Sequence, residues 1–254
     1  MTSPAAPRPD AETLGAFFHG RIRILQPKKG YRFSVDAPLL ADFIRTRPED
    51  EALEIGTGSG VISLLLSLKP FRKITAIEIQ AGLAGLARRN VELNGLGGRI
   101  EVVEADLRTF EPGRTFDLIF SNPPYIRKAA GFLGASAEKS AAKHELHGTI
   151  GEILAKTAGW LAPEGRASFV YPEKRREDFL RAAGESGLAV RRLRFVHPRT
   201  ADPANLFLIE VGRGSKAKAG MGRTAEGVEL MPPLILFGSD GKPTAAAEAI
   251  FSGT

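Results

Sequence analysis

A glycine-rich turn between an apolar strand and an apolar helix constrains this chain most. The turn is Gly56-Thr57-Gly58-Ser59-Gly60, with the mostly apolar residues 52–55 before it and 61–66 after it. An apolar strand that enters a helix through such a turn is the first βα unit of a doubly wound α/β sheet, where ligands bind at the carboxyl ends of the strands. The spacing differs from the Gly-x-Gly-x-x-Gly of dinucleotide sites. The turn therefore predicts a Rossmann-like fold and leaves the ligand open.

Three further apolar segments end in polar residues that suit a ligand. Residues 73–79 end with Glu78, residues 100–107 with Asp106, and residues 116–120 lead into Asn122. A carboxylate at the end of the second strand of such a sheet accepts hydrogen bonds from ribose hydroxyl groups. Asp106 could accept from an adenine amino group in the same way. In chain order, the strand ends therefore present a glycine turn, two acids and an amide.

The amide belongs to the segment Asn122-Pro123-Pro124-Tyr125. Proline fixes its own φ and biases the preceding residue toward extended backbone, so Asn122 and Pro123 should be held extended. Their oxygens then form fixed acceptors for a planar NH2 group, beside the ring of Tyr125. Taken alone, the segment is equally typical of a proline-rich exit from a strand with a surface tyrosine. The strand ends before it favour the pocket.

In this order, the strand ends resemble the class I S-adenosylmethionine-dependent methyltransferases, and among them the branch that methylates amino groups. The resemblance implies a seven-stranded sheet, mostly parallel with one antiparallel strand, and helices on both faces. It also implies that the glycine turn lies against the methionine part of S-adenosylmethionine, Glu78 binds its ribose, and Asp106 with Leu107 flanks its adenine. The cofactor-binding residues implied are Asp36, Glu54, Gly56, Thr57, Gly58, Gly60, Glu78, Asp106, Leu107 and Asn122.

A second resemblance concerns residues 30–43, which read GYRFSVDAPLLADF. They are similar to the segment that closes over the cofactor in the bacterial tRNA1(Val) (adenine-37 N6)-methyltransferase family. Asp36 is expected to cap the helix that follows. Weaker matches to that family are His144-Glu145, Val196-His197-Pro198 and residues 233–237 before Asp240-Gly241. This resemblance implies N6-methylation of adenine 37 in tRNA1(Val).

The catalytic residues expected for that reaction are Asn122, Pro123, Pro124 and Tyr125. The side-chain oxygen of Asn122 and the carbonyl oxygen of Pro123 would accept from the adenine amine, and Tyr125 would stack on the base. Positioning and electrostatics supply most of the rate in such a transfer. Neither a metal nor a dedicated general base is required, because the amine becomes strongly acidic once it is methylated.

The charge of the chain favours a polyanionic partner. Its formal net charge is +6, and basic residues gather in three stretches. Those expected to contact tRNA phosphates are Arg127, Lys128, Lys143, Arg194, Arg199, Arg213 and Lys216. Such contacts would position an RNA rather than read its sequence. The sequence therefore predicts tRNA as a partner and leaves the oligomeric state open.

Four regions are expected along the 254 residues. These are a disordered N-terminus at 1–15, a hairpin and helix at 16–48, the methyltransferase core at 49–212, and a basic tail with a short apolar anchor at 213–254. Residues 149–161 and 173–183 predict helices, and residues 190–196 and 206–211 an antiparallel strand pair. The chain has no cysteine and no apolar run of membrane-spanning length, which predicts a cytoplasmic protein without membrane contact.

Other functions share parts of these patterns. The nearest is a protein-glutamine N5-methyltransferase acting on peptide release factors, which uses the same amide-proline-proline-tyrosine segment. Those enzymes carry a helical domain before the core, whereas about fifty residues precede Glu54 here. DNA adenine and rRNA guanine methylation are further enzymatic alternatives. A non-catalytic RNA-binding protein with this fold is the last, and the retained turn glycines and Asn122 argue against it.

Overall fold

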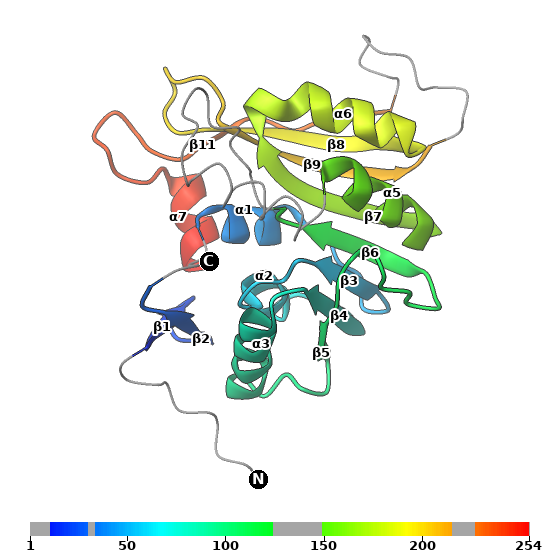
Figure 1. Cartoon of the computed structure of the whole chain (residues 1–254). Coiled ribbons are helices and arrows are strands. Elements are labelled where there is room, and N and C mark those ends of the chain that lie inside the picture. Colours follow the sequence, from blue (N-terminus) through cyan, green and yellow to red (C-terminus); the bar gives the residue numbers. More distant parts are fainter. Residues whose placement is uncertain (1–10, 30–33, 124–148, 215–226, 254) are drawn as a thin grey trace, which may run out of the picture.

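The computed structural model of the chain describes residues 11–29, 34–123, 149–214 and 227–253. Within them, a mostly parallel sheet has helices on both faces (Figure 1). Its elements are β1 (Glu12–Phe17), β2 (Ile22–Pro27), α1 (Asp36–Phe43), β3 (Glu51–Ile55), α2 (Val61–Leu66), β4 (Lys73–Glu78), α3 (Ala81–Leu93), β5 (Ile100–Glu104), β6 (Phe116–Ser121), α5 (Ile150–Trp160), β7 (Leu161–Pro172), the 3-10 helix η1 (Glu173–Arg175), α6 (Arg176–Glu185), β8 (Leu188–His197), β9 (Leu206–Arg213), β10 (Glu229–Leu230), β11 (Leu234–Ile235) and α7 (Ala245–Ser252).

The main sheet is mostly parallel with one antiparallel strand, as the family resemblance implied. Seven strands run β8-β9-β7-β6-β3-β4-β5, and β9 is antiparallel to both of its neighbours. The short strands β10 and β11 extend the edge of β8 in parallel. The seven-stranded sheet with one antiparallel strand is therefore confirmed, with two short additions. The carboxyl ends of β3, β4 and β6 meet at one edge of the sheet, called the carboxyl edge below.

Two apolar layers hold the helices onto the sheet. Along β7, Val170 packs into the layer beneath α1 and α2, while Phe169 and Tyr171 pack into the layer beneath α5 and α6. This is the alternation expected of a strand that is buried on both faces. Helix α5 begins where predicted, because the Thr149 hydroxyl accepts from the Glu152 amide and the Glu152 carboxylate accepts from the Thr149 amide.

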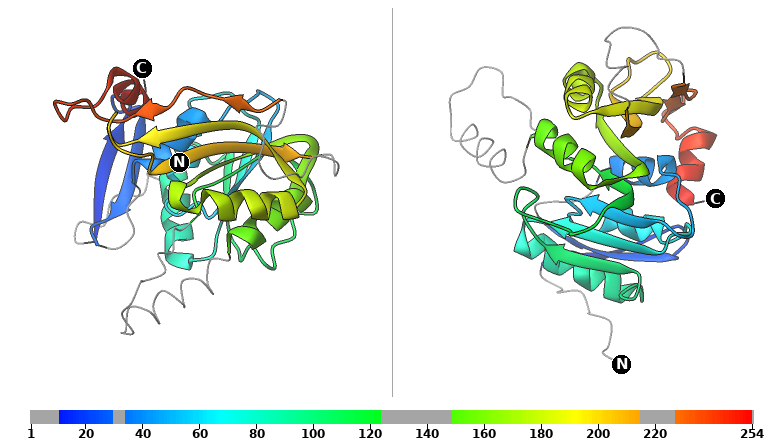
Figure 2. Two further views of the ribbon diagram at one scale, coloured as in Figure 1. Left: turned by 90° about the horizontal axis from the view of Figure 1, so that it is seen from above. Right: turned by 90° about the vertical axis from the view of Figure 1, so that its right-hand side faces the viewer.

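The hairpin β1–β2 is separate from the main sheet and begins earlier than predicted. Seen from above, it stands at one side of the molecule (Figure 2). Disorder was expected up to residue 15, but β1 starts at Glu12, whose carboxylate accepts from the Arg89 guanidinium of α3 at 2.9 Å. Residues 1–10 lie outside the described part. The early start follows from this long-range ion pair, which local composition does not reveal.

The chain beyond β9 is more structured than a tail with one anchor. Leu234 and Leu236 are buried against the layer beneath α1, and Ala247 of α7 joins the same layer. Thr244 caps α7, since its hydroxyl accepts from the Ala247 amide at 3.2 Å. Several short apolar contacts therefore fix residues 227–253 to the main sheet.

Candidate active site

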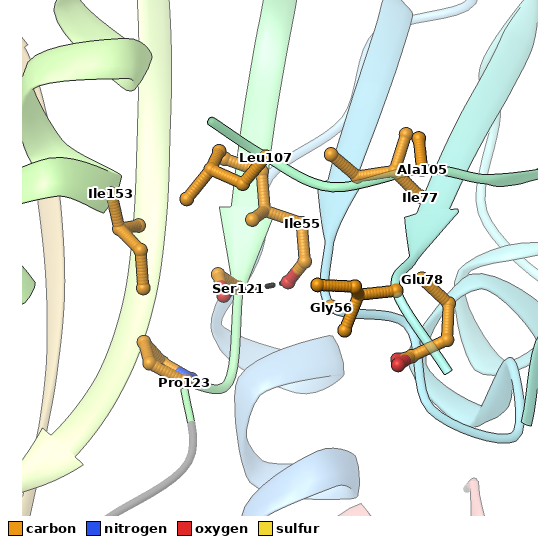
Figure 3. A pocket seen from close by; sticks show the side chains of 10 residues that line it. Ile55, Gly56, Ile77, Glu78, Ala105, Leu107, Ser121, Pro123 and Ile153 are labelled. Atoms are coloured by element: carbon orange, nitrogen blue, oxygen red, sulfur yellow. Dashed lines mark hydrogen bonds between the residues drawn. The ribbon is translucent and has the colours of Figure 1, made fainter. Parts of the chain in front are cut away.

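A pocket lies at the carboxyl edge, where the doubly wound topology brings strand ends together (Figure 3). Its lining residues are Ile55, Gly56, Ile77, Glu78, Ile79, Ala105, Leu107, Ser121, Pro123 and Ile153. Four of them, Gly56, Glu78, Leu107 and Pro123, are residues that the sequence predicted for the site. The pocket therefore joins the predicted cofactor segments to the start of the Asn122–Tyr125 segment.

The glycine turn has backbone angles that require glycine. Gly56, Gly58 and Gly60 have φ values of 71°, 59° and 84°. A Cβ on Gly60 would also lie 3.3 Å from the Cβ of Ala87 on α3. The Gly56 and Thr57 amides both donate to the Ile77 carbonyl, at 2.9 and 3.0 Å. The turn is therefore fixed against β4, and its backbone at the pocket is not covered by side chains.

Glu78, the last residue of β4, is buried, and hydrogen bonds fix the orientation of its carboxylate. One carboxylate oxygen accepts from the Gly58 amide at 2.8 Å, and the other accepts from the Gln80 amide at 2.9 Å. The residue is 4% exposed and lines the pocket. Each oxygen retains a lone pair for another donor. Glu78 is thus held ready to accept from hydroxyl groups of a ligand.

Glu54 lies beneath the glycine turn instead of lining the pocket. One oxygen accepts from the Thr57 hydroxyl at 2.6 Å and from the Ser63 hydroxyl, while the other oxygen is buried without a hydrogen-bond partner in the described residues. Burial raises the pKa of Glu54 to about 7, against the lowering effect of the two hydroxyl groups. A buried carboxyl group without a cation therefore sits directly behind the turn.

The amide segment is anchored to the neighbouring strand. The Ser121 hydroxyl donates to the Ile55 carbonyl at 2.7 Å, and Ser121 is buried. Asn122 follows at the pocket edge, half-buried, and Pro123 lines the pocket. This bond fixes the exit of β6 next to the start of the glycine turn. Pro124 and Tyr125 lie outside the described residues.

Asp106 is held by an ion pair at the margin of the site. Strand β5 ends at Glu104, three residues before the end of the segment 100–107 that the sequence predicts. The Arg108 side chain donates to both carboxylate oxygens of Asp106, at 3.0 and 2.6 Å. This guanidinium lowers the pKa of Asp106. The neighbouring Leu107 is buried and lines the pocket. Of the predicted pair Asp106 and Leu107, the apolar residue is therefore the one at the pocket wall.

The expectation that Asp36 caps α1 is wrong. The cap position is Val35, and Asp36 is the first helical residue, at the edge of burial with 9% exposure. Its carboxylate in the first turn is favourable toward the helix dipole. Pro38 lies in the same first turn, where a proline is tolerated.

The described basic residues that were expected to contact tRNA do not all lie at the carboxyl edge. Arg213 lies at the opposite edge of the sheet, where its guanidinium donates to the Leu161 carbonyl at 2.9 and 2.6 Å. Arg194 donates to the Pro232 carbonyl at 3.2 Å. Arg199, beyond the end of β8, has a side chain that is 61% exposed. The antiparallel run of β9 carries its last residue away from the pocket, which spacing along the sequence did not reveal.

Several predicted residues cannot be placed. Those outside the described part are Arg127, Lys128, Lys143, His144, Glu145 and Lys216. In the described ranges, no group of three or more His, Cys, Asp or Glu side chains could hold a metal ion. No helix in the same ranges is long and apolar enough to cross a membrane.

Sequence reasoning missed part of the pocket wall. Ile79 and Ala105 directly follow β4 and β5, and their position next to strand-end acids was a usable pattern. Ile153 of α5 also lines the pocket, but it is far along the chain from the other lining residues. Nothing local in the sequence indicated its place.

Comparison with known proteins identifies the family. Residues 32–178 match the family described as methyltransferase small domain. The chain belongs to this family. Curated relatives of this methyltransferase include proteins from Phocaeicola vulgatus, 32% identical over 76% of this chain and 82% of the relative, and from Vibrio cholerae, 30% identical over 72% and 75%. Both relatives are named tRNA1(Val) (adenine(37)-N6)-methyltransferase.

Solved structures support the fold of this methyltransferase. One is described as a predicted O-methyltransferase from Agrobacterium tumefaciens, with a TM-score of 0.63 and 21% identity over 86% of this chain and 96% of that chain. Another is the M. jannaschii tRNA m1G37 methyltransferase, with a TM-score of 0.58 and 15% identity over 81% and 58%. The protein is an S-adenosylmethionine-dependent N-methyltransferase.

The pocket residues fit S-adenosylmethionine chemically. Glu78 offers oriented acceptors for two ribose hydroxyl groups, and Leu107, Ala105 and Ile79 offer apolar surface for a flat base. When Glu54 is ionised, its oxygen that has no hydrogen-bond partner in the described residues supplies negative potential behind the glycine turn. That potential suits the positively charged methionine end of the cofactor.

Proposed function

We propose that this protein methylates N6 of an adenine in tRNA, and that the adenine is position 37 of tRNA1(Val). Relatives that carry this name are 28–32% identical to the chain over 72–78% of its length. The observation that carries the proposal is the Ser121–Ile55 hydrogen bond, because it keeps Asn122 and Pro123 at the pocket that Gly56 and Glu78 also line.

The residues at the pocket would act mainly by positioning. Bound there, S-adenosylmethionine supplies a methyl group that is already activated by a positive sulfur. Asn122 and Pro123 would accept the two N–H bonds of the adenine amine through the side-chain and backbone oxygens. That arrangement favours a more pyramidal nitrogen with an available lone pair, and it orients the amine. Tyr125 would stack on the base, a contact worth ~1–3 kcal/mol for unpaired nucleotides.

A loop adenine is a reasonable acceptor for this pocket. An unpaired base can be turned outward at lower cost than a base within a duplex. After transfer, the methylated amine is strongly acidic and releases its proton to water without a dedicated base. Arg199, exposed beyond the end of β8, is suitable for a phosphate contact. The remaining basic residues predicted for tRNA, including Arg127 and Lys128, belong to the proposal as sequence-based expectations.

The second candidate is glutamine N5-methylation of a release factor. It uses the same acceptors, because a carboxamide also presents a planar NH2 group. The two functions separate in one experiment, in which labelled methyl transfer is measured with undermodified total tRNA and with unmodified release factor. The proposal expects label in tRNA, and nucleoside digestion should recover N6-methyladenosine. Label in release factor alone would overturn it.

A further inference from the structure

Asn90 of α3 is fully buried and connects two distant segments through one side chain. Its oxygen accepts from the Leu25 amide of β2 at 2.7 Å. Its nitrogen donates to the Leu25 carbonyl at 3.0 Å and to the Ser59 carbonyl at 2.9 Å. Both amide N–H groups are therefore used, one on the N-terminal hairpin and one on the glycine turn.

Asn94, the C-cap residue of α3 and four residues later, provides a natural comparison. Its oxygen accepts from the Arg23 amide at 2.9 Å, and its nitrogen donates to the Arg23 carbonyl at 2.6 Å. Four helical residues rise ~6.0 Å and two strand residues ~6.6 Å, so residues 90 and 94 match residues 25 and 23. Together, the two asparagines pair the outer edge of β2 as a neighbouring strand would.

Only Asn90 also touches the cofactor turn. The second donor bond of Asn94 goes to the Asn90 carbonyl within α3, at 2.7 Å. The second donor bond of Asn90 goes instead to Ser59, which is 1% exposed and lies between Gly58 and Gly60. The Gly58 amide in turn donates to Glu78 at 2.8 Å. A continuous set of hydrogen bonds thus runs from β2 through Asn90 to the turn that orients Glu78.

We infer that Asn90 is a positioning residue of the cofactor site, and that the hairpin β1–β2 helps to hold the glycine turn through it. Without the Asn90 donor, the Ser59 carbonyl would be buried and unsatisfied, and the turn would shift to find another partner. Small displacements of groups that bind a ligand reduce affinity sharply. The inference concerns S-adenosylmethionine binding alone, so it stands or falls separately from the choice of methyl acceptor.

The test compares Asn90→Leu with Asn94→Leu by calorimetric titration of S-adenosylmethionine. Leucine is close to asparagine in size, and each variant removes one of the two amides that dock β2. Loss of hairpin docking should lower the thermal midpoint of both variants. The dissociation constant should rise about tenfold for Asn90→Leu, as loss of one buried hydrogen bond predicts, and less than about twofold for Asn94→Leu. Equal affinities, or an equal loss in both variants, would overturn the inference.

A second measurement needs no variant and decides the matter if Asn90→Leu does not fold. In 15N-labelled wild-type protein, titration with S-adenosylmethionine should shift the amide resonance of Leu25, which is bonded to Asn90. The amide of Arg23, bonded to Asn94, should shift much less. No shift at Leu25, or similar shifts at both amides, would contradict the coupling of the hairpin to the turn.

Discussion

Two buried carboxylates lie at opposite ends of β3, and their surroundings differ. Asp50, just before the strand, is 1% exposed and accepts from the guanidinium of Arg166 and from the Arg47 amide at 2.7 Å. Glu54, near the end of the strand, is equally buried and accepts from two hydroxyl groups, with no cation paired to it in the part of the chain that the structure describes. The same chemical group is thus neutralised at one edge of the sheet and left without a cation at the other.

The edge at Asp50, called the amino edge, is dominated by paired charges, although Arg166 Nη1 and Arg192 Nε are buried without a hydrogen-bond partner in the described residues. Arg192 donates to Glu210 at 2.9 Å and to the Phe43 carbonyl at 2.7 Å. Lys69 donates to three carbonyls near the end of α1, between 2.7 and 2.9 Å away. Cations at the end of a helix are favourable toward its dipole. The difference indicates that the amino edge is built for stability, whereas the carboxyl edge keeps a buried carboxyl group, without a cation in the described residues, beside the pocket that we propose for a cationic cofactor.

The largest expected effect tests the amino edge. Arg166→Leu leaves Asp50 buried without its cation, which should lower the free energy of unfolding by ~3–5 kcal/mol. Urea denaturation measures this loss. The double variant with Asp50→Leu should recover much of it, because an apolar pair of similar size replaces the ion pair. A loss below about 1 kcal/mol for the single variant would mean that the pair does not stabilise this edge.

The next effect tests the carboxyl edge. Asn122→Ala should reduce methyl transfer about 10²- to 10³-fold, the usual result of deleting one oriented group at the reacting centre. The dissociation constant for S-adenosylmethionine should change little. Ser121→Ala keeps the Asn122 side chain but removes the hydrogen bond from Ser121 to the Ile55 carbonyl. Its methyl-transfer rate should therefore lie between those of the wild type and Asn122→Ala. If cofactor affinity collapses in Asn122→Ala, the role given to Asn122 is wrong.

The third effect concerns the unpaired carboxyl group itself. The folded-state pKa of Glu54 is about 7, against an ordinary value of 4.5, so the folded state favours the protonated form. Its contribution to stability is therefore greatest below pH 4.5 and is lost as the pH rises to 7. The loss should amount to at most about 3 kcal/mol. Glu54→Gln should remove this pH dependence in urea titrations from pH 5 to 8.

A wild-type stability profile that matches the Glu54→Gln profile across this range would contradict the assignment. The same variant should also bind S-adenosylmethionine more weakly, since the negative potential behind the turn is gone. Cofactor titration at pH 8, where Glu54 is ionised, measures this part of the effect. Improved stability combined with weaker binding is the result that the comparison of the two edges predicts.

The smallest expected effect tests whether an ion pair at the amino edge must be buried in order to stabilise the fold. Arg45 pairs with Glu229 at 2.9 Å, but their side chains are 59% and 50% exposed. Water screens such a pair, so Arg45→Ala should leave the urea midpoint unchanged within error. A loss comparable with that of Arg166→Leu would show that burial does not explain the stability of this edge.

The sequence predicted the features that depend on neighbouring residues. The strand–turn–helix unit at Gly56, the strand end at Glu78 and the helix predicted from residue 149 all follow local patterns. The pairing of Arg166 with Asp50 joins residues 116 positions apart, and Asn90 reaches Leu25 across 65. No local periodicity encodes such contacts. Arg213 was misplaced for a related reason, because the direction of β9 and not chain proximity decides which edge it reaches.

The most direct test of the central claim compares the two edges in the wild-type protein. Hydrogen–deuterium exchange, measured with and without S-adenosylmethionine, reports where the cofactor binds. Binding should slow exchange in residues 56–60 and at Ile79 and Leu107, and leave residues 43–50 and Lys69 unchanged. Protection at Lys69 and Arg192 without protection of the glycine turn would contradict the assignment of the carboxyl edge as the methyl-transfer site.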